Sequence, residues 1–191
     1  MDEPSYQVGK IKLELGDYER AAELFDDAIK KKPNDARVWL EKGRALSRLG
    51  ESREAMACFD KALELGLSKV KESRALSEKG WTLFRERKYE EASQFLDCSL
   101  EIDQGFAEAW CLKGTILIQD DIRRYKDALT CFDNTIEILK ENPNSQWVEL
   151  AREGKEIAEH KLMEQKNMAE GEKPDDAKKP QSKRFFKRLF G

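Results

Sequence analysis

The side chains that could support catalysis or hold a metal are few in this chain. It contains four cysteines, Cys58, Cys98, Cys111 and Cys131, and one histidine, His160. A cysteine nucleophile needs a basic partner within hydrogen-bonding distance, and a zinc site needs closely spaced cysteine and histidine ligands. No CxxC spacing occurs, and no Gly-rich phosphate-binding loop is visible. We therefore expect no catalytic residue, no metal and no cofactor, and we interpret the cysteines as core side chains.

The last residues of the chain combine positive charge with aromatic rings. Basic and apolar pairs alternate over eight positions: Lys183, Arg184, Phe185, Phe186, Lys187, Arg188, Leu189 and Phe190. One turn of helix would gather the apolar side chains on one side, so this tail could contact an anionic membrane surface or enter the groove of a partner. Eight residues alone give weak membrane affinity. A disordered terminus, and a flap folded onto an apolar patch of the chain itself, are the alternatives.

Charge is distributed unevenly along the 191 residues. The net charge is −3, but residues 171–191 hold seven basic and three acidic side chains. The preceding 170 residues are therefore acidic, which disfavours binding to nucleic acid because phosphate repels such a surface. The first residues lack a basic stretch followed by an apolar one, and no eighteen apolar residues occur in a row. We expect a cytoplasmic protein, with membrane association only through the tail.

Three series of residues recur at nearly constant intervals, which indicates a repeat fold. The series are Gly9, Gly43, Gly80 and Gly114; Ala21, Ala55, Ala92 and Ala128; and Phe25, Phe59, Leu96 and Phe132. The intervals are 34, 37 and 34 residues for the glycines and 34, 37 and 36 for the other two series. A common period in three independent series identifies one structural unit of about 34 residues.

A pair of antiparallel helices explains why small and bulky residues share this period. A Gly or Ala at the crossing lets two backbones approach closely, and a bulky side chain two turns away fills the remaining space. Gly16 and Gly50 stand where a helix would stop, with Arg87 and Arg124 in the corresponding later turns. We predict helices over residues 5–15, 19–31, 36–49, 52–65, 71–86, 89–101, 107–119, 124–140 and 145–168.

Over about residues 2–144 the pattern resembles the tetratricopeptide repeat family, whose unit has fixed places for large, small, aromatic and proline residues. The four units supply Gly9, Tyr18, Ala21, Phe25, Ala28 and Pro33; Trp39, Gly43, Ala55, Phe59 and Ala62; Leu76, Gly80, Tyr89, Ala92, Leu96 and Ser99; and Trp110, Gly114, Tyr125, Ala128, Phe132 and Thr135. The resemblance implies an all-α fold, a right-handed superhelical solenoid of antiparallel helix pairs with about four repeats and a C-terminal capping helix.

The resemblance also implies the organisation of the chain. Four repeats are expected at residues 2–35, 36–69, 73–106 and 107–144, with about three additional residues near 66–72 and a longer turn around residues 120–122. Residues 145–168 form either a capping helix or the first helix of a fifth repeat, since stacked repeats need a solvated end. Residues 169–182 are polar and contain two prolines, as in a flexible linker, and residues 183–191 form the tail.

In the family, the first helix of each pair lines a concave groove that binds peptides. The resemblance places in it Lys10, Arg37, Arg44, Arg48, Arg74, Trp81, Phe84 and Arg85. Arginine forms bidentate pairs with carboxylates, and aromatic rings act as apolar anchors. The expected ligand is an acidic and hydrophobic peptide segment of another protein. A groove of this charge disfavours docking of the basic tail into it.

Other interpretations of the same residues remain open. The arginines could pair with neighbouring glutamates on a solvated helix face, with Trp81 in the core. Some family members bind chaperone C-termini through a carboxylate clamp, but at its positions this chain has Tyr6, Lys10, Glu41, Arg74 and Glu78, of which only Arg74 fits. A chaperone co-factor role is therefore not expected.

The leading hypothesis is a protein-binding scaffold or adaptor and not an enzyme, because a repeat surface with these side chains offers binding without catalytic groups. The rival hypothesis is a peripheral membrane or complex-assembly factor that the basic-aromatic tail positions. Self-association through the ends of the solenoid or through the tail is the third.

Overall fold

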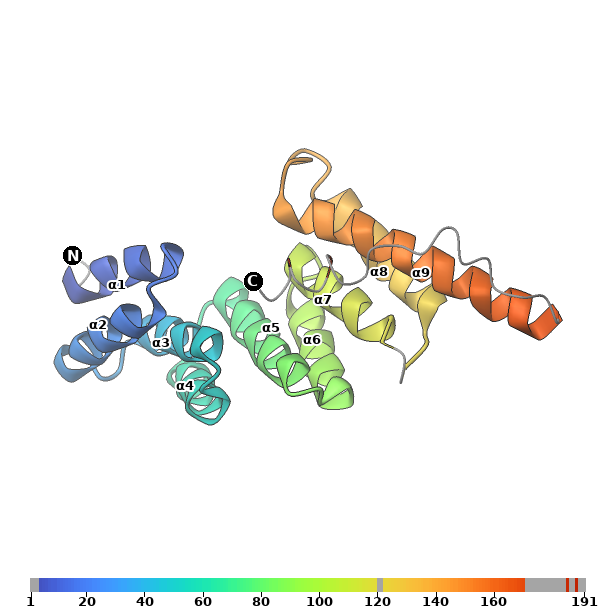
Figure 1. Cartoon of the computed structure of the whole chain (residues 1–191). Coiled ribbons are helices and arrows are strands. Elements are labelled where there is room, and N and C mark those ends of the chain that lie inside the picture. Colours follow the sequence, from blue (N-terminus) through green and yellow to red (C-terminus); the bar gives the residue numbers. More distant parts are fainter. Residues whose placement is uncertain (1–3, 120–121, 171–184, 186–187, 189–191) are drawn as a thin grey trace. The chain divides into compact units, whose positions relative to one another are not determined.

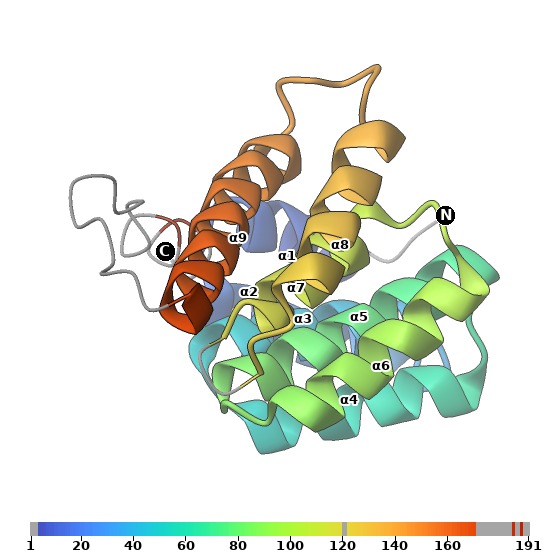
Figure 2. The ribbon, with the colours of Figure 1, turned by 90° about the vertical axis from the view of Figure 1, so that its right-hand side faces the viewer.

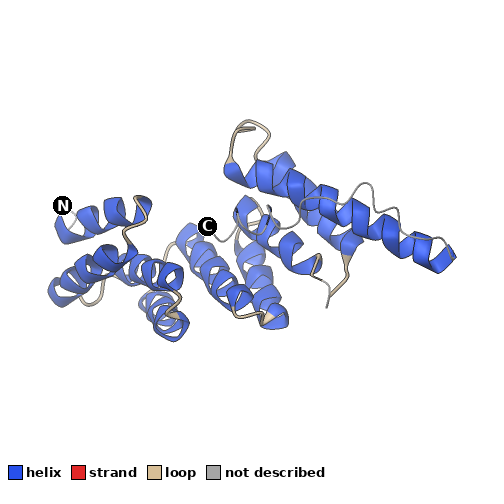
Figure 3. Ribbon diagram, in the orientation of Figure 1, coloured by secondary structure: helices blue, strands red, loops and turns tan. Residues whose placement is uncertain are grey.

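A computed structural model describes residues 4–119, 122–170, 185 and 188, and all its regular elements are helices (Figure 1 and Figure 3). They are α1 (Pro4–Glu14), α2 (Tyr18–Lys31), α3 (Ala36–Leu49), α4 (Ser52–Leu65), α5 (Lys69–Arg85), α6 (Tyr89–Ile102), α7 (Ala107–Leu117), α8 (Tyr125–Ile138) and α9 (Gln146–Glu170). Each boundary lies within two residues of the predicted one. The period of small and bulky residues was therefore sufficient to locate the helices.

The chain forms two compact units, Met1–Asp103 and Gln104–Gly191. In the N-terminal unit α1 packs with α2, α3 with α4 and α5 with α6, and Figure 2 shows α5 and α6 side by side. In the C-terminal unit α8 packs against both α7 and α9. Helix α5 begins at Lys69, before the predicted third repeat, and its 17 residues make it longer than the other helices of this unit. The residues inserted near position 66 thus add about one turn to α5.

Close approach of the two helices in a pair depends on glycine. A Cβ atom added to Gly9, Gly43 or Gly114 would lie 2.6–2.7 Å from the ring of Phe25, Phe59 or Phe132, respectively, and at Gly80 it would lie 2.9 Å from Leu96. These three rings are fully buried. Each repeat thus has the small residue and the bulky residue in direct contact, as the shared period predicted.

The turns inside the pairs contain one residue with positive φ. The values are 79° at Gly16, 88° at Gly50, 62° at Arg87 and 53° at Arg123. The last of these lies one residue before the predicted Arg124. Glycine adopts this left-handed conformation without steric cost, whereas arginine does not. Each pair therefore has a residue with left-handed backbone two positions before its second helix, even though the residue type and the length of the turn change.

Successive repeats are joined by lysine–aspartate ion pairs. In each pair the lysine directly precedes or follows a helix-crossing glycine, and the aspartate directly follows the bulky residue of the helix before it. The pairs are Lys42 with Asp26 at 2.5 Å, Lys79 with Asp60 at 2.6 Å, and Lys155 with Asp133 at 2.6 Å. The third pair links α9 to α8. Gly154 of α9 also faces the ring of Phe132, where an added Cβ would lie 2.4 Å away. Helix α9 thus packs in the manner of the first helix of another repeat.

Candidate peptide-binding site

The first helices of the three N-terminal pairs enclose a cavity of about 320 Å³. Its lining comes from α1, α3 and α5 and comprises Tyr6, Lys10, Leu13, Glu14, Glu41, Arg44, Lys71 and Arg74. Four cations and two carboxylates give this lining a positive charge, although the whole chain carries −3. Three of the residues predicted for the groove, Lys10, Arg44 and Arg74, meet here. We call this space the basic cavity.

Arg44 lies between two glutamates on the floor of the basic cavity. Its Nη1 donates to Glu41 Oε2 at 2.6 Å, and its Nε donates to Glu78 Oε1 at 3.0 Å. Arg48 contacts the second oxygen of Glu78 at 3.3 Å. Both glutamates are buried, with 7% of Glu41 and 9% of Glu78 exposed. Two of the predicted groove arginines therefore already have carboxylate partners within the chain.

The charges of this network perturb the pKa of their partners. Burial alone would raise the pKa of Glu78, but Arg48 and Arg44 outweigh burial and hold the pKa below its ordinary value of 4.5. Burial would likewise lower the pKa of Arg44, and the carboxylates of Glu78 and Glu41 raise it instead. Both shifts favour the charged forms, so Glu78 and Arg44 remain charged at neutral pH.

Two further predicted cations lie against the ring of Tyr6, which is buried. The Arg37 guanidinium is 5.5 Å from the ring centroid and Lys10 Nζ is 6.0 Å from it. Arg37 also forms a bidentate pair with Asp35, with N–O distances of 3.0 and 2.7 Å. Asp35 in turn accepts a hydrogen bond from the backbone N–H of Arg37 and caps α3. Arg37 is therefore held in place by three local contacts.

The remaining predicted groove residues belong to α5 and its neighbour α3. Trp81 and Phe84 are both buried, with ring centroids 5.9 Å apart, and the Arg48 guanidinium covers Trp81 at 5.4 Å. Arg85 is exposed and donates a hydrogen bond to the carbonyl of Ser47. The two aromatic side chains thus lie inside the unit, as in the core interpretation of Trp81.

Lys71 was missed by the sequence analysis, although it lines the basic cavity beside Arg74. The two residues are three positions apart on α5 and so lie on the same side of the helix. Within the described part of the chain no carboxylate lies at ion-pair distance from either, although the charge of Arg74 contributes to lowering the pKa of Glu78. Lys71 was overlooked because it belongs to the inserted turn and has no counterpart in the 34-residue pattern.

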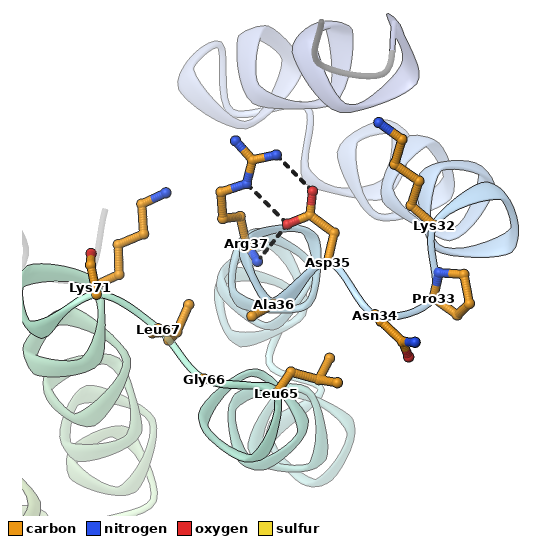
Figure 4. Close-up of a pocket in the computed structure, with 11 residues that line it drawn as sticks. Lys32, Pro33, Asn34, Asp35, Ala36, Arg37, Leu65, Gly66, Leu67 and Lys71 are labelled. Atoms are coloured by element: carbon orange, nitrogen blue, oxygen red, sulfur yellow. Dashed lines mark hydrogen bonds and ion pairs between the residues drawn. The ribbon is translucent and has the colours of Figure 1, made fainter.

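A second cavity, of about 630 Å³, opens next to the loops that precede α3 and α5. Figure 4 shows it with the Arg37–Asp35 pair on α3 and Lys71 on the neighbouring helix. It is lined by Lys32, Pro33, Asn34, Asp35, Ala36, Arg37, Leu65, Gly66, Leu67, Ser68 and Lys71. Because Lys71 lines both cavities, they are adjacent. Together they extend the positively charged surface of the N-terminal unit from its first helices to its loops.

Two residues of the predicted tail fall in the described part of the C-terminal unit. Phe185 is 1% exposed and belongs to a buried cluster with residues of α7, α8 and α9. Arg188 pairs with Glu153 at 2.5 Å and with Glu149, both on α9. Of the alternatives for the tail, these two residues match a flap folded onto the chain itself. The predicted contacts of Lys183, Arg184, Phe186, Lys187, Leu189 and Phe190 lie outside the described residues.

Reactive side chains are not gathered at any of these places. Burial raises the pKa of the Cys58 thiol to about 11, and burial also raises the pKa of Cys111. Cys98, which we expected in the core, is exposed because it is out of phase with the buried residues Leu96 and Leu100 of α6. Over the described ranges, no group of three His, Cys, Asp or Glu side chains is arranged to hold a metal. No described helix is long and apolar enough to span a membrane.

The family model of the tetratricopeptide repeat matches residues 6–66 and 40–105, which together cover more than half of the chain. The chain belongs to the tetratricopeptide repeat family, and its fold is an all-α helical repeat solenoid. Proteins with this fold are in general non-enzymatic scaffolds for protein–protein interaction, so the fold implies protein partners.

Curated relatives and solved structures are similar over most of the chain. A tetratricopeptide-repeat-containing protein of Methanocaldococcus jannaschii is 28% identical over 137 residues, 68% of this chain and 24% of the relative. A homologue of DnaJ homolog subfamily C member 7 from Schizosaccharomyces pombe is 23% identical over 146 residues, 70% of this chain and 30% of the relative. The chain thus spans less than a third of the length of these relatives.

Among solved structures, the Cut9 and Hcn1 hetero-tetramer matches 83% of this chain and 30% of the other chain, at 17% identity and a TM-score of 0.70. MamA from Desulfovibrio magneticus RS-1 matches 89% of this chain and 92% of its own, at 19% identity and a TM-score of 0.65. YrrB, described as a repeat protein with an unusual peptide-binding site, matches 83% and 76%, at 18% identity and a TM-score of 0.57. At these identities the likeness shows the fold.

Proposed function

We propose that this protein is a scaffold whose N-terminal unit binds a peptide segment of another protein, rich in carboxylates and hydrophobic side chains, between α1, α3 and α5. The observation that supports it is the basic cavity, where Lys71 and Arg74 face a space large enough for side chains of a ligand. Carboxylates are the complementary groups, since charge-assisted hydrogen bonds to Lys and Arg are about twice as strong as neutral ones. Leu13 and the Tyr6 ring offer apolar contacts to the same segment.

The cations divide into two groups with different roles in this proposal. Arg44 and Arg48 hold the buried carboxylate of Glu78 and shape the floor of the cavity. Lys71 and Arg74 are half-buried and line the cavity, and no carboxylate of the described residues lies within ion-pair distance of either. Reversing Arg44 or Arg48 would leave Glu78 against another carboxylate and destabilise the unit. Reversing Lys71 and Arg74 changes the charge of the cavity and breaks no ion pair of this kind, although Arg74→Glu also removes one of the positive charges that lower the pKa of Glu78.

The experiment measures binding of a fluorescein-labelled peptide of alternating Glu and Leu residues by fluorescence anisotropy, at about 0.1 M salt so that the Debye length is about 10 Å. We expect Lys71→Glu combined with Arg74→Glu to raise Kd at least tenfold, about 1.4 kcal/mol. A matched pair of substitutions, Lys126→Glu with Lys140→Glu, makes the same change in net charge on the C-terminal unit and should leave Kd within twofold.

A second peptide distinguishes recognition of carboxylates from nonspecific binding. In this peptide Lys replaces every Glu of the Glu–Leu sequence, and it should not bind the wild-type chain. Equal losses in the two double variants would mean that only the net charge matters, and an unchanged Kd in Lys71→Glu with Arg74→Glu would refute the site. Circular dichroism of each variant establishes that the helices persist.

A further inference from the structure

The core of the C-terminal unit contains an aromatic ring from the tail, beyond the end of α9. Phe185 is one of the largest fully buried side chains of the protein. It shares one buried cluster with Cys111 and Ile118 of the α7 region and with Leu150 of α9. The ring is therefore buried among apolar side chains that come from all three helices of this unit.

Arg188 adds a polar anchor three positions further along the chain. Phe185 and Arg188 both have helical backbone. The Arg188 guanidinium contacts Glu149 and Glu153, which are themselves one turn apart on α9. The second oxygen of Glu153, Oε2, is buried and accepts no hydrogen bond within the described residues. The guanidinium is thus the cation that balances a partly buried carboxylate.

The charge of this surface is opposite to that of the basic cavity. A basic tail is repelled by the basic cavity of the N-terminal unit, where Arg44, Lys71 and Arg74 gather. Helix α9 instead presents Glu149 and Glu153 to the tail.

From these contacts we infer that α7 and α9 form a second peptide-binding site, selective for a short segment with Phe followed three positions later by Arg, and that the chain's own Phe185 and Arg188 occupy it in cis. The apolar cluster receives the aromatic ring, and the Glu149–Glu153 pair receives the guanidinium. A segment of another protein with the same two side chains has to displace the tail. This inference does not depend on the proposed function of the N-terminal unit, because it concerns other helices and a ligand of the opposite charge.

Because the tail is covalently connected to α9, it should bind the site in preference to a free peptide of the same sequence. Fourteen residues separate the end of α9 at Glu170 from Phe185. A ligand tethered over such a distance acts at an effective concentration on the order of millimolar. A free peptide of the same sequence should therefore bind the intact protein weakly. It should bind much more tightly once the tethered residues are changed.

The experiment uses the full chain and a fluorescein-labelled peptide corresponding to residues 182–191. Phe185→Ala combined with Arg188→Ala should vacate the site, and we expect this variant to bind the added peptide with a Kd at least tenfold lower than that of the wild-type chain. Glu149→Lys with Glu153→Lys, added to the vacated variant, should abolish that binding. Binding should also weaken several-fold at 1 M salt, where charges on the surface are screened beyond about 3 Å.

Further arms of the experiment test specificity and folding. A peptide with Phe185→Ala and Arg188→Ala should not bind, and far-ultraviolet circular dichroism should show the same helix content in all variants. If the vacated chain loses its fold, a charge exchange, Arg188→Glu with Glu149→Arg and Glu153→Arg in the full chain, still tests the contact. The exchange should restore the melting temperature that Arg188→Glu alone lowers.

Three results would overturn the inference. The first is equal binding of the peptide to wild-type and vacated chains. The second is a dimer in light scattering that dissociates on Phe185→Ala with Arg188→Ala, since the tail would then act on a second copy. The third is co-sedimentation of the wild-type chain with vesicles of phosphatidylcholine and phosphatidylserine that is lost in the same variant, since the tail would then be a membrane ligand.

Discussion

At the scale of single residues, the arginines and lysines of the inner helices have two distinct roles. Arg44 and Arg48 balance the buried carboxylate of Glu78, whereas Lys71 and Arg74 line a cavity with no such pair of their own. Removing one member of a buried ion pair costs far more than removing an exposed charge, because the remaining charge stays buried. Substitutions in the two groups should therefore affect different properties, stability in the first and binding in the second.

Glu78→Gln should lower the free energy of unfolding at pH 7 by about 3 kcal/mol, because Arg44 and Arg48 lose their shared carboxylate. Urea unfolding measures this change. Glu23→Gln is the matched control, since Glu23 forms an exposed pair with Arg20 and should cost less than about 0.5 kcal/mol.

The pH dependence of stability should change in the same variant. The folded-state pKa of Glu78 is below 4.5, so its contribution is fully present above pH 4.5 and is lost as the pH falls through the folded-state value. Glu78→Gln removes this proton uptake. The unfolding free energy of the variant should therefore fall less steeply than that of the wild type below pH 4.5. Parallel curves would show that the pKa of Glu78 is the same in the folded and unfolded states.

At the scale of helices, the repeats are specified by a few positions where geometry leaves little choice. Gly43 and Gly154 leave space for aromatic rings, and Gly50 ends α3 with a positive φ. Glycine is replaced by Arg87 and Arg123 in the later turns, and both arginines keep a positive φ. The contacts that give α9 the character of a repeat helix are Gly154 against Phe132 and Lys155 with Asp133.

Gly154→Ala should destabilise the C-terminal unit by about 1–3 kcal/mol, because the added methyl group would overlap the buried ring of Phe132. Thermal unfolding followed by circular dichroism measures the effect. Arg152→Ala, at an exposed position of the same helix, is the control and should change stability by less than about 0.5 kcal/mol. A stability gain in Gly154→Ala, as helix propensity alone would predict, would show that α9 is not packed closely on α8.

Gly50→Ala isolates the cost of the turn conformation. No atom lies within 4 Å of the position of the added Cβ, so only the φ of 88° opposes the substitution. We expect a loss of about 1 kcal/mol in urea unfolding. Gly50→Asn should lose less, because Asn tolerates the left-handed region better than Ala. Equal losses would mean that the turn relaxes to another conformation.

At the scale of the whole molecule, the N-terminal and C-terminal units have surfaces of opposite charge. The basic cavity of the N-terminal unit suits a carboxylate-rich segment, whereas α9 of the C-terminal unit binds the guanidinium of Arg188. The two proposals therefore concern different units of the chain and ligands of opposite charge.

The sequence predicted the features that recur with the repeat period, and it did not predict contacts between residues that are far apart in the chain. The helices and their Gly–Phe contacts recur with the 34-residue period, so residues such as Gly43 and Phe59 located them. Arg44 and Glu78 are 34 residues apart and lie on different helices. The residues around a charged side chain do not show with which distant side chain it will pair. Lys71 lies in an insertion outside the period. The place of Phe185 depends on packing between α7 and α9, which no short pattern encodes.

The most direct test of the proposed function is to locate a bound acidic peptide on the intact chain. Backbone amide signals in two-dimensional nuclear magnetic resonance spectra should be compared with and without the Glu–Leu peptide. The account predicts shifts at the inner sides of α1, α3 and α5, including Tyr6, Lys71 and Arg74, with little change in α2, α4 and α6. Shifts confined to α7–α9, or to the outer helices, would contradict it.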